Sequence, residues 1–327
     1  MFPFLLALAL FFDFLNGFHD SSNIVATAIS SGSMRPRSAL VLAALAEFAG
    51  PFIFGVAVAT TIGEGLLDLS VIPAHAITAA LLAAVIWNLI TWYIGIPSSS
   101  SHALIGGLLG SAVLAGGFGW INPSGLIKIL AALLISPVLG LAAGFLAMRS
   151  VLWAARGASP RVNYLFRRLQ VGTLLALALS HGTNDAQKTM GVIAMGLVAS
   201  GYLDVFYVPL WVIAASAGAI ALGTSLGGWR LIRTLGGKIM RVRPVHAFTS
   251  QVAGTAVILG AALLGGPVST TQVMSSAIMG VGAAERITKV RWLILQDMVT
   301  AWLLTIPVTA AVSALAYLLL NAIQRGG

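Results

Sequence analysis

The chain consists of apolar runs that recur from one end to the other, most of them long enough to cross a bilayer as a helix. Runs bounded by polar residues, Gly or Pro lie at about 3–31, 39–62, 76–95, 98–116, 125–148, 171–200, 207–225, 246–264, 268–284 and 292–320. A helix needs about 20 apolar residues to span a hydrocarbon core of about 30 Å. Only 8% of the residues are charged, against about 25% in soluble domains. The pattern predicts an all-α polytopic membrane protein with ten crossings.

The basic residues predict how the chain is oriented. The net charge of +9 would suggest a nucleic-acid partner in a soluble protein, but these residues cluster between the apolar runs. Short loops rich in Lys and Arg remain in the cytoplasm. The clusters at 35–37, 149–168, 230–243 and 286–291 are therefore expected inside, with both termini outside, and the bilayer rather than nucleic acid is the expected partner. The absence of cysteine excludes thiolate metal sites and disulfides.

Two motifs occur twice. Residues 17–23 (GFHDSSN) return at 182–188 (GTNDAQK), and residues 97–102 (PSSSSH) return at 267–272 (PVSTTQ). The near-constant spacing predicts two halves, 1–148 and 171–322, joined by a basic cytoplasmic linker at 149–170. Five crossings in each half would turn the second half upside down relative to the first. Inverted repeats of this kind are typical of secondary transporters, whose site lies near the midplane.

The first and sixth runs, 3–31 and 171–200, are too long for a plain crossing and are interrupted by polar residues at 16–23 and 180–188. Non-helical backbone at membrane depth is tolerated where it lines a protein-enclosed cavity. We therefore expect broken helices or re-entrant half-helices in these runs.

Two carboxylates lie inside the apolar runs. Asp20 and Asp185 would each cost at least about 2.5 kcal/mol at the bilayer centre, which requires a reason such as cation binding. Hydrogen bonding between helices is the structural alternative. On helices, Asp20 and Asn23 lie on one polar face, and Asn184, Gln187 and Lys188 on another. Lys188 is expected to pair with Asp185 rather than to bind a ligand.

Each proline-led run is expected to begin a helix. Proline suits the first turn, and Ser or Thr suits the N-cap. The backbone N–H groups there point outward with the positive end of the helix dipole, which favours a bound oxyanion. The alternative is that the hydroxyls only cap the helices. The hydroxyl residues in question are Ser98, Ser99, Ser100 and Ser101 in the first half, and Ser269, Thr270 and Thr271 in the second.

An oxyanion beside Asp20 and Asp185 would be repelled, so a cation should accompany it, either Na⁺ or protons. Bound Na⁺ would make the two carboxylates metal ligands. His19, His102 and Glu47 are further candidates for proton transfer, with structural hydrogen bonding as the alternative for the histidines. An intramembrane enzyme is disfavoured, because Ser101 and His102 are adjacent and point about 100° apart on a helix.

These motifs resemble the signatures of the PiT family of inorganic phosphate transporters, particularly its bacterial low-affinity branch. The matching segments are 16–23, 97–102, 180–191 and 267–271. The resemblance implies a dimeric, cation-coupled phosphate symporter in a prokaryotic cytoplasmic (inner) membrane, working by alternating access and needing no cofactor beyond the coupling cation. Sulfate carriers resemble the family too, so sulfate or another tetrahedral oxyanion is the alternative substrate.

Two sets of site residues follow as expectations. The substrate-binding set is Asn23, Ser98, Ser99, Ser100, Ser101, Asn184, Gln187, Ser269, Thr270 and Thr271, and the cation-binding set is Asp20, Asn23, Thr183, Asn184 and Asp185. The sequence departs from the family pattern at His19, where sodium-coupled members often have Asn, and this favours protons. It departs again at Gln272, where a His is frequent.

Overall fold

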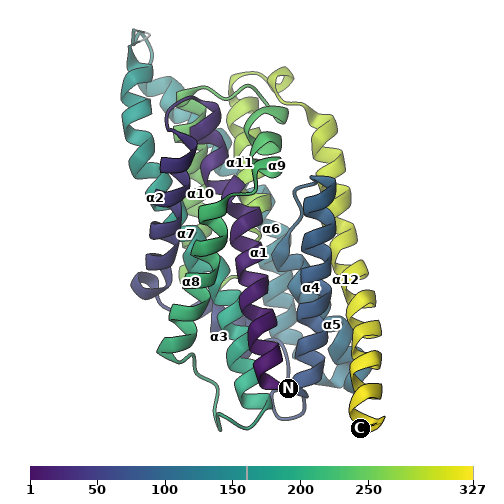
Figure 1. Cartoon of the computed structure of the whole chain (residues 1–327). Coiled ribbons are helices and arrows are strands. Elements are labelled where there is room, and N and C mark those ends of the chain that lie inside the picture. Colours follow the sequence, from purple (N-terminus) through teal and green to yellow (C-terminus); the bar gives the residue numbers. More distant parts are fainter. Residues whose placement is uncertain (160, 327) are drawn as a thin grey trace.

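The computed structural model describes residues 1–159 and 161–326, and these form a bundle made almost entirely of helices (Figure 1). None of the described residues belongs to a sheet. The one β-type pairing among them is an isolated antiparallel bridge between Leu67 and Ile121, in two connecting loops. The all-helical membrane fold expected from the apolar runs is confirmed.

Each half of the chain contributes six helices in the same order. The first half contains α1 (Phe2–Ser30), α2 (Pro36–Phe54), α3 (Ala57–Gly63), α4 (Ala74–Ile94), α5 (Ser100–Gly116) and α6 (Pro123–Ala154). The second contains α7 (Val162–Ala199), α8 (Leu210–Leu226), α9 (Trp229–Arg233), α10 (Pro244–Leu263), α11 (Thr270–Glu285) and α12 (Trp292–Gly326). Short 3₁₀ turns lie at Phe118–Trp120 and Ile287–Lys289, and a π-helical turn at Thr234–Lys238.

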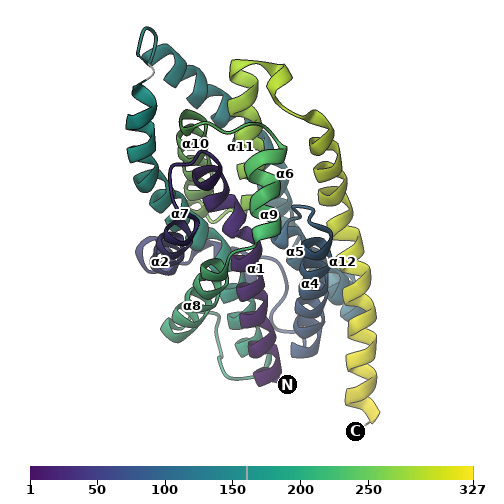
Figure 2. The ribbon, with the colours of Figure 1, turned by 45° about the horizontal axis from the view of Figure 1, so that its top comes forward.

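The corresponding helices of the two halves run in opposite directions. In Figures 1 and 2, α1 runs away from the end of the bundle that carries the N-terminus, whereas α7 runs towards it. The packing repeats with the halves exchanged, because α5 packs against α12 as α11 packs against α6, and α1 packs against α8 as α2 packs against α7. Both termini lie at the same end of the bundle (Figure 1). The helices extend into the predicted linker, since α6 ends at Ala154 and α7 begins at Val162.

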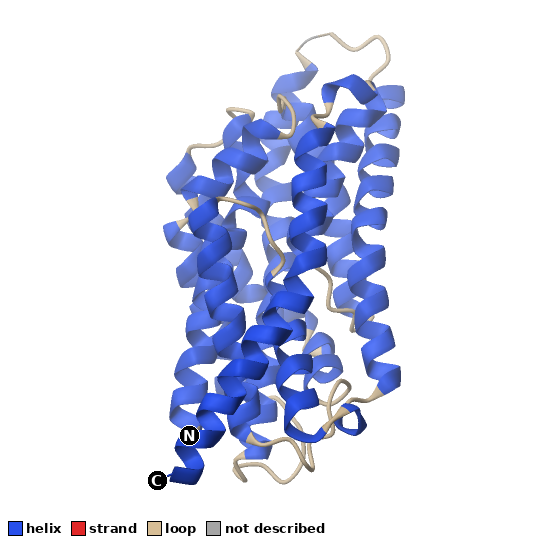
Figure 3. Cartoon of the chain, turned by 90° about the vertical axis from the view of Figure 1, so that its right-hand side faces the viewer, coloured by secondary structure: helices blue, strands red, loops and turns tan. Residues whose placement is uncertain are grey.

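The expectation of about ten crossings, five in each half, stays a prediction. Among the described residues, six helices are long and apolar enough to cross a membrane, and up to seven if α8 and α9, which meet at a 60° bend, count as one. Helices α5 and α11 have 17 and 16 residues, about 25 Å each, and are short of a hydrocarbon core of about 30 Å. They begin part-way along the bundle, where loops interrupt the helices in Figure 3.

The breaks lie elsewhere than the polar residues suggested. Helices α1 and α7 are continuous through residues 16–23 and 180–188, so the expectation of a broken helix in these two runs was wrong. Their polar side chains bond to neighbouring helices and to interrupted segments of other helices, and their own backbones keep the helical hydrogen bonds. The breaks follow α2, α4, α8 and α10, at Gly55, Gly95, Gly227 and Gly265, all with positive φ, a conformation that glycine adopts without steric cost.

Helices α2 and α7 touch backbone to backbone, which fixes the position of the acidic side chain at Glu47. A Cβ added to Gly182 would lie 2.2 Å from the Glu47 carbonyl oxygen, and one added to Gly50 would lie 2.4 Å from the Leu179 carbonyl oxygen. Small residues let membrane helices approach this closely. Glycine at 182 is therefore required by the crossing of α2 over α7.

We expect Gly182→Ala to force α2 away from α7. Overpacking of a tight contact costs about 1–3 kcal/mol, so the melting temperature of the purified protein in detergent should fall by several degrees. The matched control is Gly218→Ala on α8, where an added Cβ meets nothing within 4 Å. An unchanged or higher melting temperature for Gly182→Ala would contradict the close crossing.

Candidate functional site

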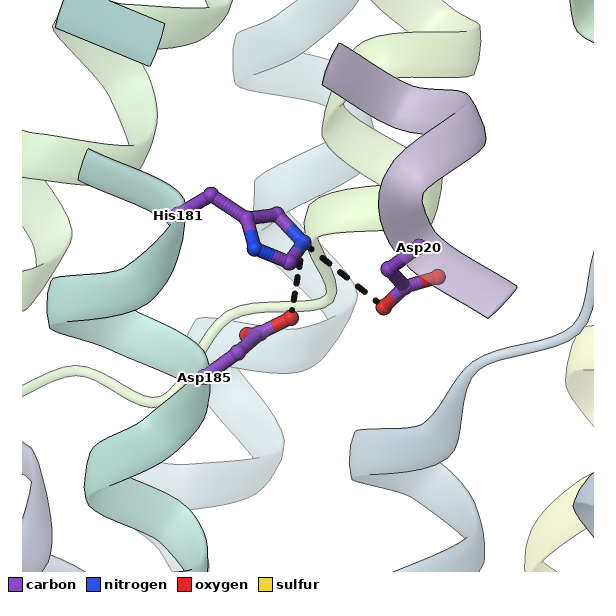
Figure 4. A group of neighbouring side chains, drawn as sticks. All are labelled: Asp20, His181 and Asp185. Carbon is purple, nitrogen blue, oxygen red and sulfur yellow. Dashed lines mark ion pairs between the residues drawn. The ribbon is translucent and has the colours of Figure 1, made fainter. Parts of the chain in front are cut away.

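The centre of the bundle contains a histidine surrounded by three carboxylates. His181 on α7 has its Nδ1 2.6 Å from Glu47 Oε1 of α2 and its Nε2 3.1 Å from Asp185 Oδ2. The same Nε2 lies 3.8 Å from Asp20 Oδ2 of α1. Figure 4 shows the imidazole ring pointing between Asp20 and Asp185. All four side chains are buried, and three helices from both halves position them.

Lys188 joins this cluster to both proline-led runs. Its amino group forms an ion pair with Asp185, one turn away on α7. It also donates to Ser101 Oγ at 2.5 Å and to the Val268 carbonyl oxygen at 2.8 Å. The expected pairing of Lys188 with Asp185 is confirmed. The same amino group therefore lies where the two halves of the chain meet.

The first turn of α11 bonds to carboxylates of both halves. Ser269 is the N-cap, and its hydroxyl accepts from the Gln272 backbone N–H at 3.3 Å. Thr270 Oγ1 lies 2.8 Å from Asp185 Oδ2 and 3.4 Å from Asp20 Oδ2. Thr271 donates to Asp20 Oδ1 at 2.9 Å and accepts from Asn23 Nδ2 at 3.0 Å. The hydroxyls of this turn therefore bond the two carboxylates predicted to bind the cation.

The first turn of α5 meets α11 from the other half. Ser99 is the N-cap, with its hydroxyl 3.1 Å from the His102 backbone N–H and 2.7 Å from His102 Nδ1. Ser101 donates to the Val268 carbonyl oxygen at 3.1 Å, so the two proline-led runs are in direct contact. Both runs begin helices with a serine N-cap, as the sequence predicted. The positive ends of two oppositely directed helices meet beside Lys188, which is favourable for an oxyanion.

Four residues of the predicted sets make structural bonds away from this centre. Asn184 donates to the Gly266 carbonyl oxygen at 3.1 Å and accepts from the Val268 N–H at 3.3 Å. Thr183 donates to the carbonyl oxygen of Leu179 on its own helix, and Ser98 donates to Thr91 Oγ1.

Gln187 is the fourth of these residues, and it bonds the break between α2 and α3. Its Oε1 accepts from the backbone N–H groups of Val58 at 2.7 Å and Ala59 at 3.2 Å, and its Nε2 donates to the Gly55 carbonyl oxygen at 2.6 Å. Buried backbone groups must be satisfied in this way. Ligand roles for Asn184, Gln187, Thr183 and Ser98 stay predictions.

The remaining candidates differ in their surroundings. Glu47 lies in the central cluster, whereas His102 lines an apolar cavity of about 380 Å³ between α6, α11 and α12. His19 is buried on α1, one residue before Asp20. Among the described residues, its Nε2 has no hydrogen-bond partner. Ser100 is buried in the first turn of α5.

The central cluster is formally short of positive charge. Among the described residues, the ion-pair partners of Asp20, Glu47 and Asp185 are Lys188 and His181, and the latter is positive only when protonated. Burying an uncompensated carboxylate is strongly unfavourable, so bound protons or a cation would stabilise this arrangement. Asp20, His181 and Asp185 have ligand atoms within 4.8 Å of one another, which fits either a shared proton or a small cation.

His181, the residue at the centre, is not among the candidates drawn from the sequence. The aligned repeat begins at Gly182, one position after it. Two signals point to it: His181 lies four residues before Asp185, on the same helix face, and it is an ionisable residue inside an apolar run.

The sequence and the fold are both similar to known proteins. Residues 16–159 and 154–313 match the model of the Phosphate transporter family. A Bacillus subtilis (strain 168) protein named "Probable low-affinity inorganic phosphate transporter" is 45% identical over 319 residues, covering 96% of each chain. A Rhizobium meliloti (strain 1021) protein of the same name is 45% identical over 315 residues, covering 96% of this chain and 94% of its own. A solved structure described as "The sodium-dependent phosphate transporter" matches with a TM-score of 0.88 at 25% identity, covering 98% of this chain and 99% of its own.

Proposed function

Because the chain belongs to the phosphate transporter family, we propose that it imports inorganic phosphate together with a cation by alternating access. Membership confirms the resemblance drawn from the four motifs, and the chain is a multi-pass membrane transporter rather than an enzyme. The observation that carries the proposal is the meeting of two helix N-termini beside Lys188 and a carboxylate cluster short of positive charge. The N-termini suit an anion and the carboxylates suit a cation.

The cluster supports specific roles for the residues. Asp20 and Asp185 hold or exchange the coupling cation, while the first turns of α5 and α11 hold the oxyanion. Within these turns, Ser101 of α5 accepts from Lys188, and Thr270 of α11 contacts both Asp20 and Asp185. Asn23 and Asn184 complete the proposed oxyanion site by orienting Thr271 and Val268.

The coupling cation in this proposal is the proton. His181 lies between Glu47 and Asp185 at distances that suit proton exchange, and the two ring nitrogens of an imidazole can accept and donate a proton. Sodium is the second candidate, favoured by the match to a solved sodium-dependent phosphate transporter and by the oxygen ligands of Asp20 and Asp185.

Other parts of the proposal rest on the resemblance and on charge. The protein would lie in a prokaryotic cytoplasmic membrane, in keeping with its bacterial relatives. It would be a homodimer, as the resemblance implies. The N- and C-termini would lie outside, because the basic loops lie at the opposite end of the bundle. The moving units would be the halves 1–148 and 171–322, with 149–170 as the linker.

Uptake of labelled phosphate into liposomes containing the purified protein tests this function directly. Proton and sodium gradients are imposed separately, with unlabelled sulfate as competitor and protein-free liposomes as the blank. We expect uptake to follow the proton gradient and to be indifferent to sulfate. Uptake that follows sodium alone would replace the proton, competition by sulfate would indicate a general oxyanion carrier, and no uptake under either gradient would reject the proposal.

A further inference from the structure

A second cavity, of about 690 Å³, lies near the end of the bundle that carries the N-terminus, away from the central site. It is lined by α3, the start of α6 and the end of α10, including Thr61, Glu64, Asn122, Lys128 and Gly265. Apart from the central Lys188, the other basic side chains that the structure describes lie in or beside the segments towards the opposite end. Lys128 is therefore an isolated positive charge within a membrane-spanning helix.

The side chain of Lys128 points across this cavity. Its Nζ donates to Thr61 Oγ1 of α3 at 3.3 Å, and a Cβ added to Gly265 would lie 3.5 Å from the same Nζ. A lysine near a helix end commonly directs its amino group along the lipid surface to the interface, but this one is directed to the ends of two other helices. An ammonium group has three N–H donors, and Thr61 takes one of them.

Two segments at helix breaks contribute to the lining of this cavity, and α7 holds both of them through side-chain bonds. Residues 55–59 are held by Gln187, whose side chain bonds Gly55, Val58 and Ala59. Residues 264–268 are held by Asn184 through Gly266 and Val268. Ala57 and Gly265, one from each segment, line the cavity. A few side-chain hydrogen bonds from α7 therefore hold residues 55–59 and 264–268 in place.

The corresponding turn of the first half also lies beside a cation. Gly95 matches Gly265 in the repeat and likewise ends the preceding helix with a positive φ. A Cβ added there would lie 3.2 Å from Arg230 Cδ, and the Arg230 guanidinium donates to the Tyr93 carbonyl oxygen. Each turn that leads into a proline-led run thus lies next to one basic side chain.

We propose that this cavity is an access vestibule in which Lys128 captures a tetrahedral oxyanion, and that residues 55–59 and 264–268 form the gate to the central site. The inference rests on the proposed phosphate transport and adds to it a capture subsite. Lys128 offers a charge-assisted hydrogen bond to an oxyanion oxygen. Glu64 lines the same cavity and offsets the charge of Lys128, so the vestibule carries no net charge. The anion is therefore held weakly and moves inward when the gate opens.

The first test is the phosphate dependence of uptake by Lys128→Met. The apparent KM should rise about tenfold, which corresponds to about 1.4 kcal/mol, with the maximal rate within about twofold of wild type because Lys128 does not contact the central cluster. Lys128→Arg should keep a KM close to that of wild type. An unchanged KM in Lys128→Met would reject the capture site while wild-type uptake upheld the proposed function. A wild-type protein that takes up no phosphate would reject the function itself.

The absence of cysteine from the chain allows a chemical rescue. Lys128→Cys should show the raised KM, and modification with aminoethyl methanethiosulfonate, which restores a positive charge, should lower it towards wild type. The anionic sulfonatoethyl reagent should not. The matched control is Phe118→Cys, at a residue 79% exposed in the connection between α5 and α6, where neither reagent should change uptake. Equal effects of both reagents at position 128 would show that bulk rather than charge matters, and would reject the capture role.

The gate is tested by labelling from the vestibule side. Val268→Cys introduces a thiol at a position 3% exposed, three residues after Gly265 of the cavity lining, and should react slowly with a membrane-impermeant thiol reagent. Adding Asn184→Ala removes both bonds that hold residues 264–268 to α7 through this side chain, so the labelling rate should rise at least about fivefold. A rate that Asn184→Ala leaves unchanged would reject these residues as the gate.

Discussion

Asp185→Asn is expected to reduce phosphate uptake to below about 1% of the wild-type rate while leaving the protein folded. The carboxylate contacts Lys188, His181 and Thr270 at once, so it lies where the proposed cation and anion sites meet. An amide of the same shape keeps a hydrogen-bond acceptor for Thr270 but carries no charge. A loss of at least about a hundredfold corresponds to about 2.7 kcal/mol, close to the cost of breaking a buried charge pair.

The measurement is initial-rate uptake in liposomes at equal protein content, with monodispersity and melting temperature checked in detergent. Asp204→Asn is the control, because Asp204 lies in the exposed loop between α7 and α8. Normal coupled uptake by Asp185→Asn would remove this carboxylate from the mechanism.

His181→Leu should produce the largest loss of stability. The imidazole lies between three buried carboxylates, and its removal leaves one ion pair in this cluster among the described residues, that of Asp185 with Lys188. Removing one partner of a buried charge pair costs about 3–5 kcal/mol, so the melting temperature should fall steeply. We expect the second change Glu47→Gln to restore part of this loss, because it removes the carboxylate that lies 2.6 Å from His181 Nδ1.

The double-mutant comparison separates charge from packing. If Glu47→Gln lowers stability by the same amount in wild type and in His181→Leu, the two residues are not coupled, and the central role of His181 would be wrong. Melting temperatures of the four proteins in one detergent provide the answer. Uptake by the single variants then shows whether the coupling also matters for transport.

The sequence predicted the architecture well because two physical signals were strong. Apolar runs separated by basic loops predicted a polytopic helical protein, and the repeated motifs predicted two halves of opposite orientation. The serine N-caps of α5 and α11 followed from the proline-led runs. The number of crossings could not be obtained this way, since a half-length helix and a full crossing are both apolar.

The breaks in the helices were misplaced for a physical reason. Polar residues inside an apolar run indicate that a buried polar group must be hydrogen-bonded there. They do not show whether this group belongs to their own helix or to the backbone of a neighbour. In α7 it is the neighbour's, since Gln187 and Asn184 bond interrupted segments of other helices. His181 was missed because its partner Glu47 comes from α2, more than a hundred residues away, and no local spacing reveals such a contact.

The first turn of α11 has a consequence for how tightly the movements of the two ions would be coupled. Thr270 has a single hydroxyl proton, and its Oγ1 lies within 3.4 Å of carboxylate oxygens from both halves. Thr271 donates to one of these carboxylates, that of Asp20. Neither carboxylate can change its charge without altering a bond of the turn that would hold the anion. With the cation and the anion bound as proposed, such a carrier would resist uncoupled transport, because an ion that binds alone leaves the other binding site misaligned and dissociates to the side from which it came.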